Sequence, residues 1–106
     1  MGKIGMKSDK KIKQFQVTID PNLPLFIISV VSEMVDIPIW TLRKLDEMGI
    51  VQPERKGKKV RCYSKVQIER LVYVHYLMEE KGVNISGIKI ILELEERKEE
   101  KSGSIS

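Results

Sequence analysis

Apolar residues recur at helical spacing in two short stretches between residues 29 and 49. The inner face of the first predicted helix consists of Val31, Met34 and Val35. The inner face of the second consists of Leu42, Leu45 and Met48. Ser29 is the expected cap of the first helix, Pro38 suits the first turn of the second, and Gly49 suits the left-handed position after it. The break at residues 36–38 makes the connection tight, so the pair predicts a helix-turn-helix.

The pattern becomes extended after this pair of helices. Residues 50–53 and 60–63 flank a basic, turn-prone segment, residues 55–59, which contains Gly57. Two short extended segments around such a turn predict a β-hairpin. Alternation in the second segment predicts one face that packs inward and one that meets a partner. These faces are Val60 with Cys62 and Arg61 with Tyr63.

Two further helices are predicted beyond the hairpin. Ser64 and Gln67 have the spacing of a capping box, which starts the third helix. Apolar positions of that helix include Ile68, Leu71, Val72, Leu77 and Met78. Gly82 ends it, and Asn84 caps a fourth helix whose apolar side is Ile88, Ile91 and Leu92. With a short extended segment at residues 24–28, the order is short strand, two helices, β-hairpin wing and two further helices. The predicted fold is therefore a mainly α winged helix-turn-helix.

The chain divides into three parts on this interpretation. Residues 1–23 form a flexible basic arm, with five lysines and a break at residues 20–21, although residues 15–19 alternate well enough for a short strand. Such an arm either touches DNA phosphates or stays disordered. Residues 24–95 form the folded domain. Residues 96–106 form a charged tail that is expected to fray.

Charge is distributed unevenly along the 106 residues, whose net charge is +4. Residues 55–65 hold six Lys or Arg and no Asp or Glu, whereas residues 93–101 hold five Glu against three basic residues. A local basic segment indicates a polyanionic partner, since the nearby field sets the attraction to phosphate. The alternative is a solvated lysine-rich loop with no partner.

Cysteine usage and hydropathy restrict the compartment. The single cysteine, Cys62, excludes an internal disulfide and a multi-cysteine zinc site, which fits a reducing environment. Apolar runs are far shorter than the roughly 20 residues of a membrane span, and no secretory signal is recognisable. We therefore expect a cytoplasmic protein without a membrane partner.

DNA binding requires polar side chains at the start of a helix that enters the major groove, and cations along the flanking phosphates. Thr41 and Arg43 are expected in the exposed first turns of the second helix, where Arg43 bridges phosphate oxygens or reads guanine. Trp40 is either a core residue or a contact to a thymine methyl or sugar. The complete predicted DNA-binding set is Trp40, Thr41, Arg43, Lys44, Lys56, Lys58, Lys59, Arg61 and Tyr63.

Catalysis is not indicated. His75 is the single histidine and lies in the middle of the third helix with no nucleophile beside it. Gly57 stands alone, so there is no glycine-rich phosphate loop. We expect no catalytic residue, no cofactor and no metal.

Five motifs occur in the order that characterises the MerR family of transcriptional regulators. They are Ile28-Ser29-Val30, Thr41-Leu42-Arg43, Gly49-Ile50-Val51-x-Pro53-x-Arg55, Arg61-x-Tyr63-Ser64 and Gly82-Val83-Asn84-x-x-Gly87-Ile88-Lys89. The resemblance covers residues 25–95. Within the family the chain is most similar to the heat-shock repressors (HspR), and next to the glutamine synthetase repressors.

This resemblance implies a homodimer on an inverted repeat, repression of stress or chaperone genes, and a DnaK-type chaperone as co-repressor. It assigns family DNA contacts to Thr41, Arg43, Arg61 and Tyr63. The chain departs from the family at Leu45-Asp46, where Tyr-Glu or Tyr-Asp is usual, and at Cys62, where a second arginine is usual.

Family members dimerise through a long helix after the DNA-binding domain, but only about a dozen residues follow Leu94, without an apolar seam. The expected dimer contact is therefore Ile88, Ile91 and Leu92 with the third helix, and the alternative is a weak monomer. Three other functions stay open. The same fold serves excisionase-like or packaging-type architectural proteins, the chain is also similar to glutamine synthetase repressors, and a basic loop can bind an acidic protein.

Overall fold

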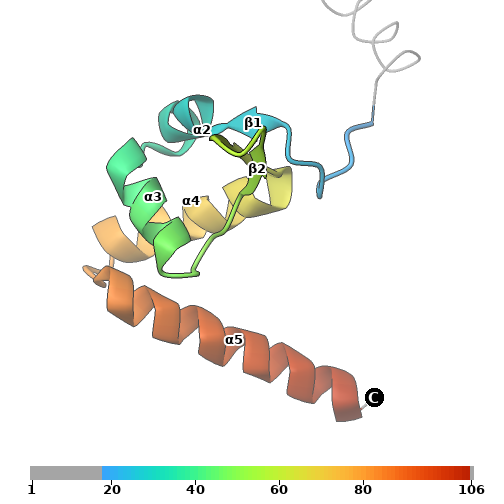
Figure 1. Ribbon diagram of the computed structural model, residues 1–106. Coiled ribbons are helices and arrows are strands. Elements are labelled where there is room, and N and C mark those ends of the chain that lie inside the picture. The colour runs from blue at the N-terminus through green and yellow to red at the C-terminus, as the bar shows by residue number, and fades with distance from the viewer. Residues whose placement is uncertain (1–17, 106) are drawn as a thin grey trace, which may run out of the picture.

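Residues 18–105 are described by a computed structural model, with side chains through residue 99. Within this range the chain forms four helices and one antiparallel sheet of three strands, in the order β1-β3-β2 (Figure 1). The elements are β1 Phe26–Ile27, α2 Ile28–Val35, α3 Ile39–Glu47, β2 Glu54–Lys56, β3 Val60–Tyr63, α4 Lys65–Glu79 and α5 Ile85–Ile105. The predicted winged helix-turn-helix is confirmed. Residues 1–17 of the predicted arm lie outside the described residues, and so does most of the possible strand at residues 15–19.

The hydrophobic core joins all of the helices to the middle strand. Its fully buried side chains include Val31, Leu42, Leu45, Tyr63, Leu71, Val74 and Ile88, which come from α2, α3, β3, α4 and α5. Burial of apolar area from five separate elements is what holds α3 and the hairpin in fixed relative positions.

The helix-turn-helix forms as predicted, but two residues of α2, Ser29 and Met34, differ from their predicted roles. Asp36 ends α2 in the left-handed conformation, and the Ser32 hydroxyl donates to the Ile37 carbonyl at 2.6 Å, which closes the turn. Ser29 does not cap α2, because β1 leads directly into the helix and Ile27 is the N-terminal cap residue without a side-chain bond. Met34 is exposed, since a two-turn helix buries only a narrow stripe.

The first strand of the hairpin lies later along the chain than predicted, at residues 54–56 and not at residues 50–53. Its pairing aligns Glu54 with Cys62 and Lys56 with Val60, so residues 50–53 are not a strand. The backbone N–H groups of Ile50 and Val51 instead donate to the Leu45 carbonyl, at 2.9 and 3.4 Å. Their amides complete the end of α3 and their side chains enter the core, which leaves them unavailable for a sheet.

The helix α4 begins at the predicted capping box. The Ser64 hydroxyl accepts from the Gln67 N–H at 3.2 Å, and the Gln67 side-chain oxygen accepts from the Ser64 N–H at 3.0 Å. Val72 was predicted on the buried side of this helix but is exposed. Val74 is buried in the core in its place.

The helix α5 begins after Asn84, whose side-chain oxygen accepts from the Gly87 N–H at 2.8 Å, as predicted. It continues to Ile105 and so projects away from the body of the domain (Figure 1). The residues after Leu94, which were expected to fray, continue this helix. Two side chains of α4 hold this part of α5: Tyr73 donates to Glu95 at 2.7 Å, and Arg70 to Glu96 at 3.0 Å. The described residues contain no helix that is both long and apolar enough to span a membrane.

Candidate nucleic-acid interface

The outer surface of α3 carries the side chains expected to meet DNA. Trp40 is 72% exposed, and Arg43 and Lys44 are also exposed. The interpretation of Trp40 as a core residue is therefore wrong. An exposed indole at the start of a helix offers a large flat surface and one N–H donor to a ligand.

Thr41 was predicted at the exposed start of this helix, but it is only 2% exposed. It lies on the same side of α3 as Leu42 and Leu45, both of which are fully buried. Its hydroxyl therefore cannot reach a phosphate in this conformation, and the expected exposure is wrong.

Tyr63 was predicted on a strand face that meets a partner, but its side chain is fully buried. Neighbouring strand residues point to opposite faces, and Cys62 is buried as well, so the end of β3 is covered on both sides. Burial raises the pKa of Tyr63 to about 12, with the Asp46 charge adding to the rise and Arg61 opposing it. Among the described residues the hydroxyl has no hydrogen-bond partner.

The hairpin carries the exposed cations. Lys56, Lys58 and Lys59 are exposed around its turn, and Lys58 holds a left-handed backbone with φ +70°. Arg61 differs from them, because its side chain is only 14% exposed and its Nε donates to Asp46 Oδ2 at 2.8 Å. Three of the four predicted hairpin cations are therefore accessible, whereas Arg61 is bound within the domain.

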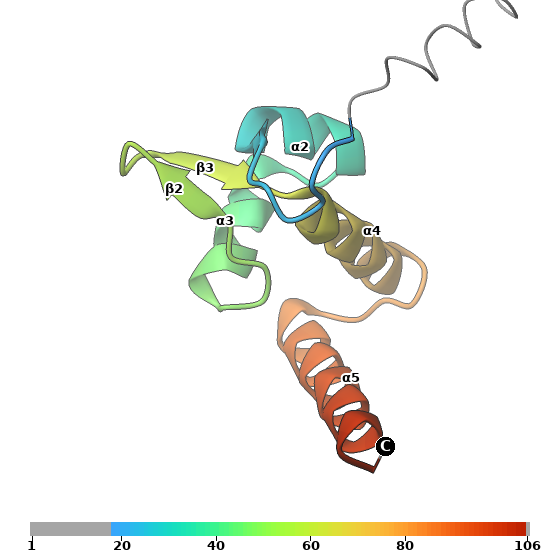
Figure 2. The ribbon, with the colours of Figure 1, turned by 90° about the vertical axis from the view of Figure 1, so that its right-hand side faces the viewer.

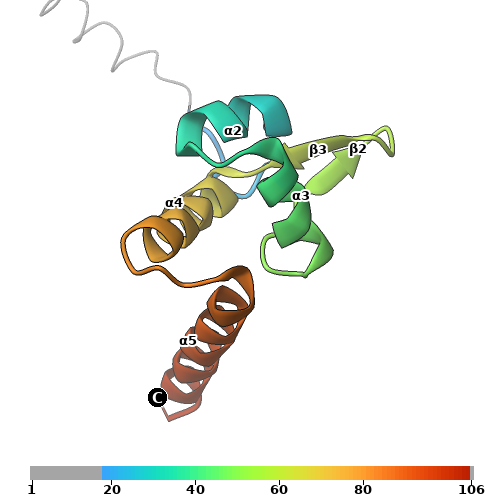
Figure 3. The ribbon, with the colours of Figure 1, turned by 90° about the vertical axis from the view of Figure 1, so that its left-hand side faces the viewer.

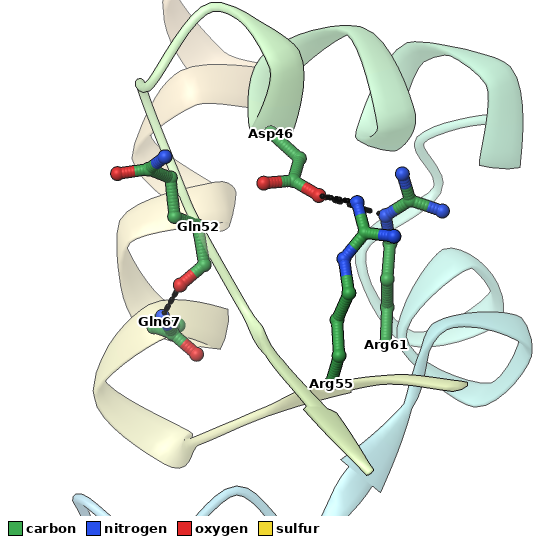
Figure 4. A network of polar contacts seen from close by, with 5 residues as sticks. All are labelled: Asp46, Gln52, Arg55, Arg61 and Gln67. Carbon is green, nitrogen blue, oxygen red and sulfur yellow. Dashed lines mark hydrogen bonds and ion pairs between the residues drawn. The ribbon is translucent and has the colours of Figure 1, made fainter. Parts of the chain in front are cut away.

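A polar network fixes the hairpin against both neighbouring helices (Figure 4). Asp46, in the last turn of α3, accepts from Arg61 and from an Arg55 NH2 group at 3.3 Å. On the other side, the Gln67 amide of α4 donates to the Gln52 carbonyl at 2.6 Å. The helix α3 and the hairpin lie together on one side of the molecule and α4 lies on the other (Figures 2 and 3).

These ties were not predicted from the sequence. In the sequence, Asp46 stands out only as part of a departure from the family, and Arg55 only as a member of a motif and of the basic segment. The available signal was a carboxylate in the last turn of a helix, where the negative end of the helix dipole disfavours it unless a cation lies close.

Two of the three predicted dimer residues lie in the core of their own chain. Ile88 is fully buried and Leu92 is buried, because the first turns of α5 close the core of the same chain. Ile91 is partly buried against that core. Ile88 and Leu92 are therefore enclosed by their own chain in this conformation, which does not favour a dimer contact through them. Among the residues of α5 up to 99, the exposed large apolar side chains are Ile90 and Leu94.

Comparison with known proteins agrees with this geometry. The sequence profile described as MerR HTH family regulatory protein matches residues 26–95, about two thirds of the chain. The chain belongs to the MerR family. The family is one of regulatory proteins and not a class of enzymes.

Two kinds of regulator are similar to this chain. A Streptomyces coelicolor protein named heat shock protein HspR is 40% identical over 72 residues, which are 68% of this chain and 48% of that protein. A Bacillus anthracis regulator named HTH-type transcriptional regulator GlnR is 29% identical over 77 residues, 73% of this chain and 59% of the regulator. This MerR-family chain thus spans about half the length of the curated relatives that it matches.

Proposed function

We propose that this chain is a sequence-specific DNA-binding regulator that acts as a repressor at an inverted repeat. The observation that carries the proposal is that α3, with Arg43 and Lys44 exposed, and the hairpin, with three exposed lysines, lie on the same side of the molecule (Figures 2 and 3). The Asp46 network holds these two elements at a fixed spacing. A rigid pair of this kind suits a groove and its adjacent phosphate backbone.

Each element has its own task in this proposal. The helix α3 enters the major groove, where Arg43 reads guanine or bridges phosphates and Trp40 contacts a thymine methyl or sugar. Lys56, Lys58 and Lys59 lie along the neighbouring phosphates and release condensed counterions.

The target genes are proposed to be those of stress response or chaperones. The higher identity to the protein named HspR than to GlnR favours this choice over nitrogen regulation. A DnaK-type chaperone is proposed as co-repressor from the same resemblance. The cytoplasm is proposed as the location from the single cysteine and the short apolar runs of the sequence. Addition of purified chaperone to the DNA complex tests the partner, since a co-repressor has to increase the affinity for the operator.

Binding to an inverted repeat requires two copies of the chain. We propose that they meet through the projecting part of α5, where Ile90 and Leu94 are exposed. Leu94→Glu is expected to shift the sedimenting species to monomer, with Leu23→Glu as the control because Leu23 is exposed near β1. Sedimentation of the two variants at the same value as wild type would refute this contact.

Footprinting on genomic fragments tests the function itself. Protection of a promoter upstream of chaperone genes supports the repressor, protection upstream of glutamine synthetase genes supports the second regulator, and protection of recombination sites supports an architectural role. Arg43→Ala is expected to weaken specific binding by about 1–3 kcal/mol if it reads a base. Unchanged affinity would remove Arg43 from the interface.

The hairpin lysines are tested through salt. Neutralising Lys58 and Lys59 together is expected to lower the slope of log affinity against log salt by about 2, because each phosphate contact contributes about 0.9. Lys89→Gln is the matched control, since it removes an exposed lysine of α5 outside the proposed face. An unaltered slope in the double variant would mean that the hairpin does not touch DNA.

A further inference from the structure

We infer that Arg55 is a further phosphate-binding residue of this face and that Asp46 is its positioning residue. The inference rests on the proposed function. It assigns Arg61 a structural part, as the cation that holds Asp46 in place.

Each of the three charged side chains in the network lies at a position that is unfavourable for its charge when considered alone. Arg55 and Arg61 are direct cross-strand partners in the hairpin, and like charges in that relation destabilise a strand pair. Asp46 lies at the end of α3, where the helix dipole disfavours a negative charge. A single carboxylate oxygen that accepts from both guanidinium groups offsets both effects.

The two arginines are not equivalent within this network. Arg61 is held by the short bond, at 2.8 Å, and its side chain is 14% exposed. Arg55 makes the longer bond, at 3.3 Å through one NH2 group, and its side chain is 49% exposed. Among the described residues no other partner of the Arg55 side chain is found. A guanidinium has five N–H donors, so Arg55 keeps most of its capacity for a phosphate.

The position of Arg55 fits such a contact. It lies in β2, directly before Lys56, and its side chain points toward Asp46 of α3 (Figure 4). Asp46 is nearly buried, so the network presents a net positive charge with the carboxylate shielded from DNA. Anchoring by Asp46 also restricts the rotamers of Arg55, which lowers the entropy lost when a phosphate is bound.

Arg55→Gln tests the contact. Affinity for a duplex carrying the footprinted site and for a scrambled duplex is measured by fluorescence anisotropy over a range of salt. We expect a loss of about tenfold on both duplexes and a salt slope lower by about one, because a phosphate contact is independent of sequence. Unchanged affinity and slope would overturn the assignment of Arg55.

Asp46→Asn separates positioning from simple charge. Removal of a negative charge near DNA is expected to raise the affinity for any duplex. Loss of Asp46 also releases α3 from the hairpin, and the preference for the specific site depends on how α3 is placed against the hairpin. We therefore expect affinity for the scrambled duplex to be kept or raised and the ratio of specific to scrambled affinity to fall about tenfold.

Glu47→Gln is the matched control for Asp46→Asn, because Glu47 is the next residue of α3, is exposed and forms no ion pair among the described residues. Equal effects of the two variants would overturn the positioning role. Asp46→Glu keeps the negative charge and is expected to restore part of the ratio of specific to scrambled affinity. This variant also tests the inference if Asp46→Asn fails to fold. If wild type protects no fragment, the proposed function fails. If wild type and Arg43→Ala behave as expected and the Arg55 and Asp46 variants do not, only this inference fails.

Discussion

Tyr63→Phe removes one buried oxygen from the core and changes little else. The hydroxyl has no hydrogen-bond partner among the described residues, and the side chain is fully buried. An unpaired polar group of this kind costs about 1–3 kcal/mol when it is taken out of water. Because Phe fills the same volume without a cavity, we expect the variant to be more stable than wild type by about 1–2 kcal/mol at neutral pH.

The effect of the same substitution on the free energy of unfolding is expected to depend on pH in the alkaline range. Folding raises the pKa of Tyr63 from 10.0 to about 12, so the unfolded chain loses this proton first. The stabilisation that belongs to the neutral phenol is present below pH 10 and is lost as the pH rises through 12. Two pKa units correspond to about 2.7 kcal/mol, so the advantage of the Phe variant is expected to grow by up to that amount above pH 10.

Urea denaturation of both proteins at pH 7, 9 and 11 measures this difference. The two proteins share every other ionisable group, so the difference between their free energies of unfolding isolates Tyr63. Tyr76→Phe, at an exposed position of α4, is the control and is expected to leave the free energy of unfolding at pH 7 nearly unchanged. A Phe variant that is less stable by more than about 1 kcal/mol, or that binds DNA more weakly at pH 7, would refute the burial of this hydroxyl in the working state.

Three other variants test local features of the fold. Lys58→Gly relieves the left-handed backbone at φ +70° and is expected to raise stability by about 0.5–1 kcal/mol while DNA affinity falls; a parallel change in both would contradict this. Ser64→Ala removes the capping box of α4 and is expected to cost about 1 kcal/mol in urea denaturation, so an unchanged midpoint would mean that the cap does not stabilise the helix. Leu71→Ala empties a fully buried position and is expected to cost about 2–5 kcal/mol; a loss below 1 kcal/mol would mean that the core collapses around it.

Features that depend on neighbouring residues were predictable from the sequence. The capping box at Ser64, the cap at Asn84 and the turn that ends with Pro38 all formed where expected. Each of these depends on hydrogen bonds or dihedral preferences within about four residues, so the local order of side chains is enough to specify it. The same holds for the order of elements, which follows from the period of the apolar positions.

Features that depend on which elements cover one another were decided only by the tertiary structure. Thr41 and Tyr63 look available along the chain, but core packing encloses both, while Trp40 is left exposed. Ile88 faces the core of its own chain and not a second copy.

The Asp46 network belongs to this second class. It joins residues separated by nine and fifteen positions, and neither pairing has a local pattern that marks it. Periodicity states which side of a helix or strand is apolar, but the element that covers it, and the charge that lies opposite, depend on contacts between distant parts of the chain.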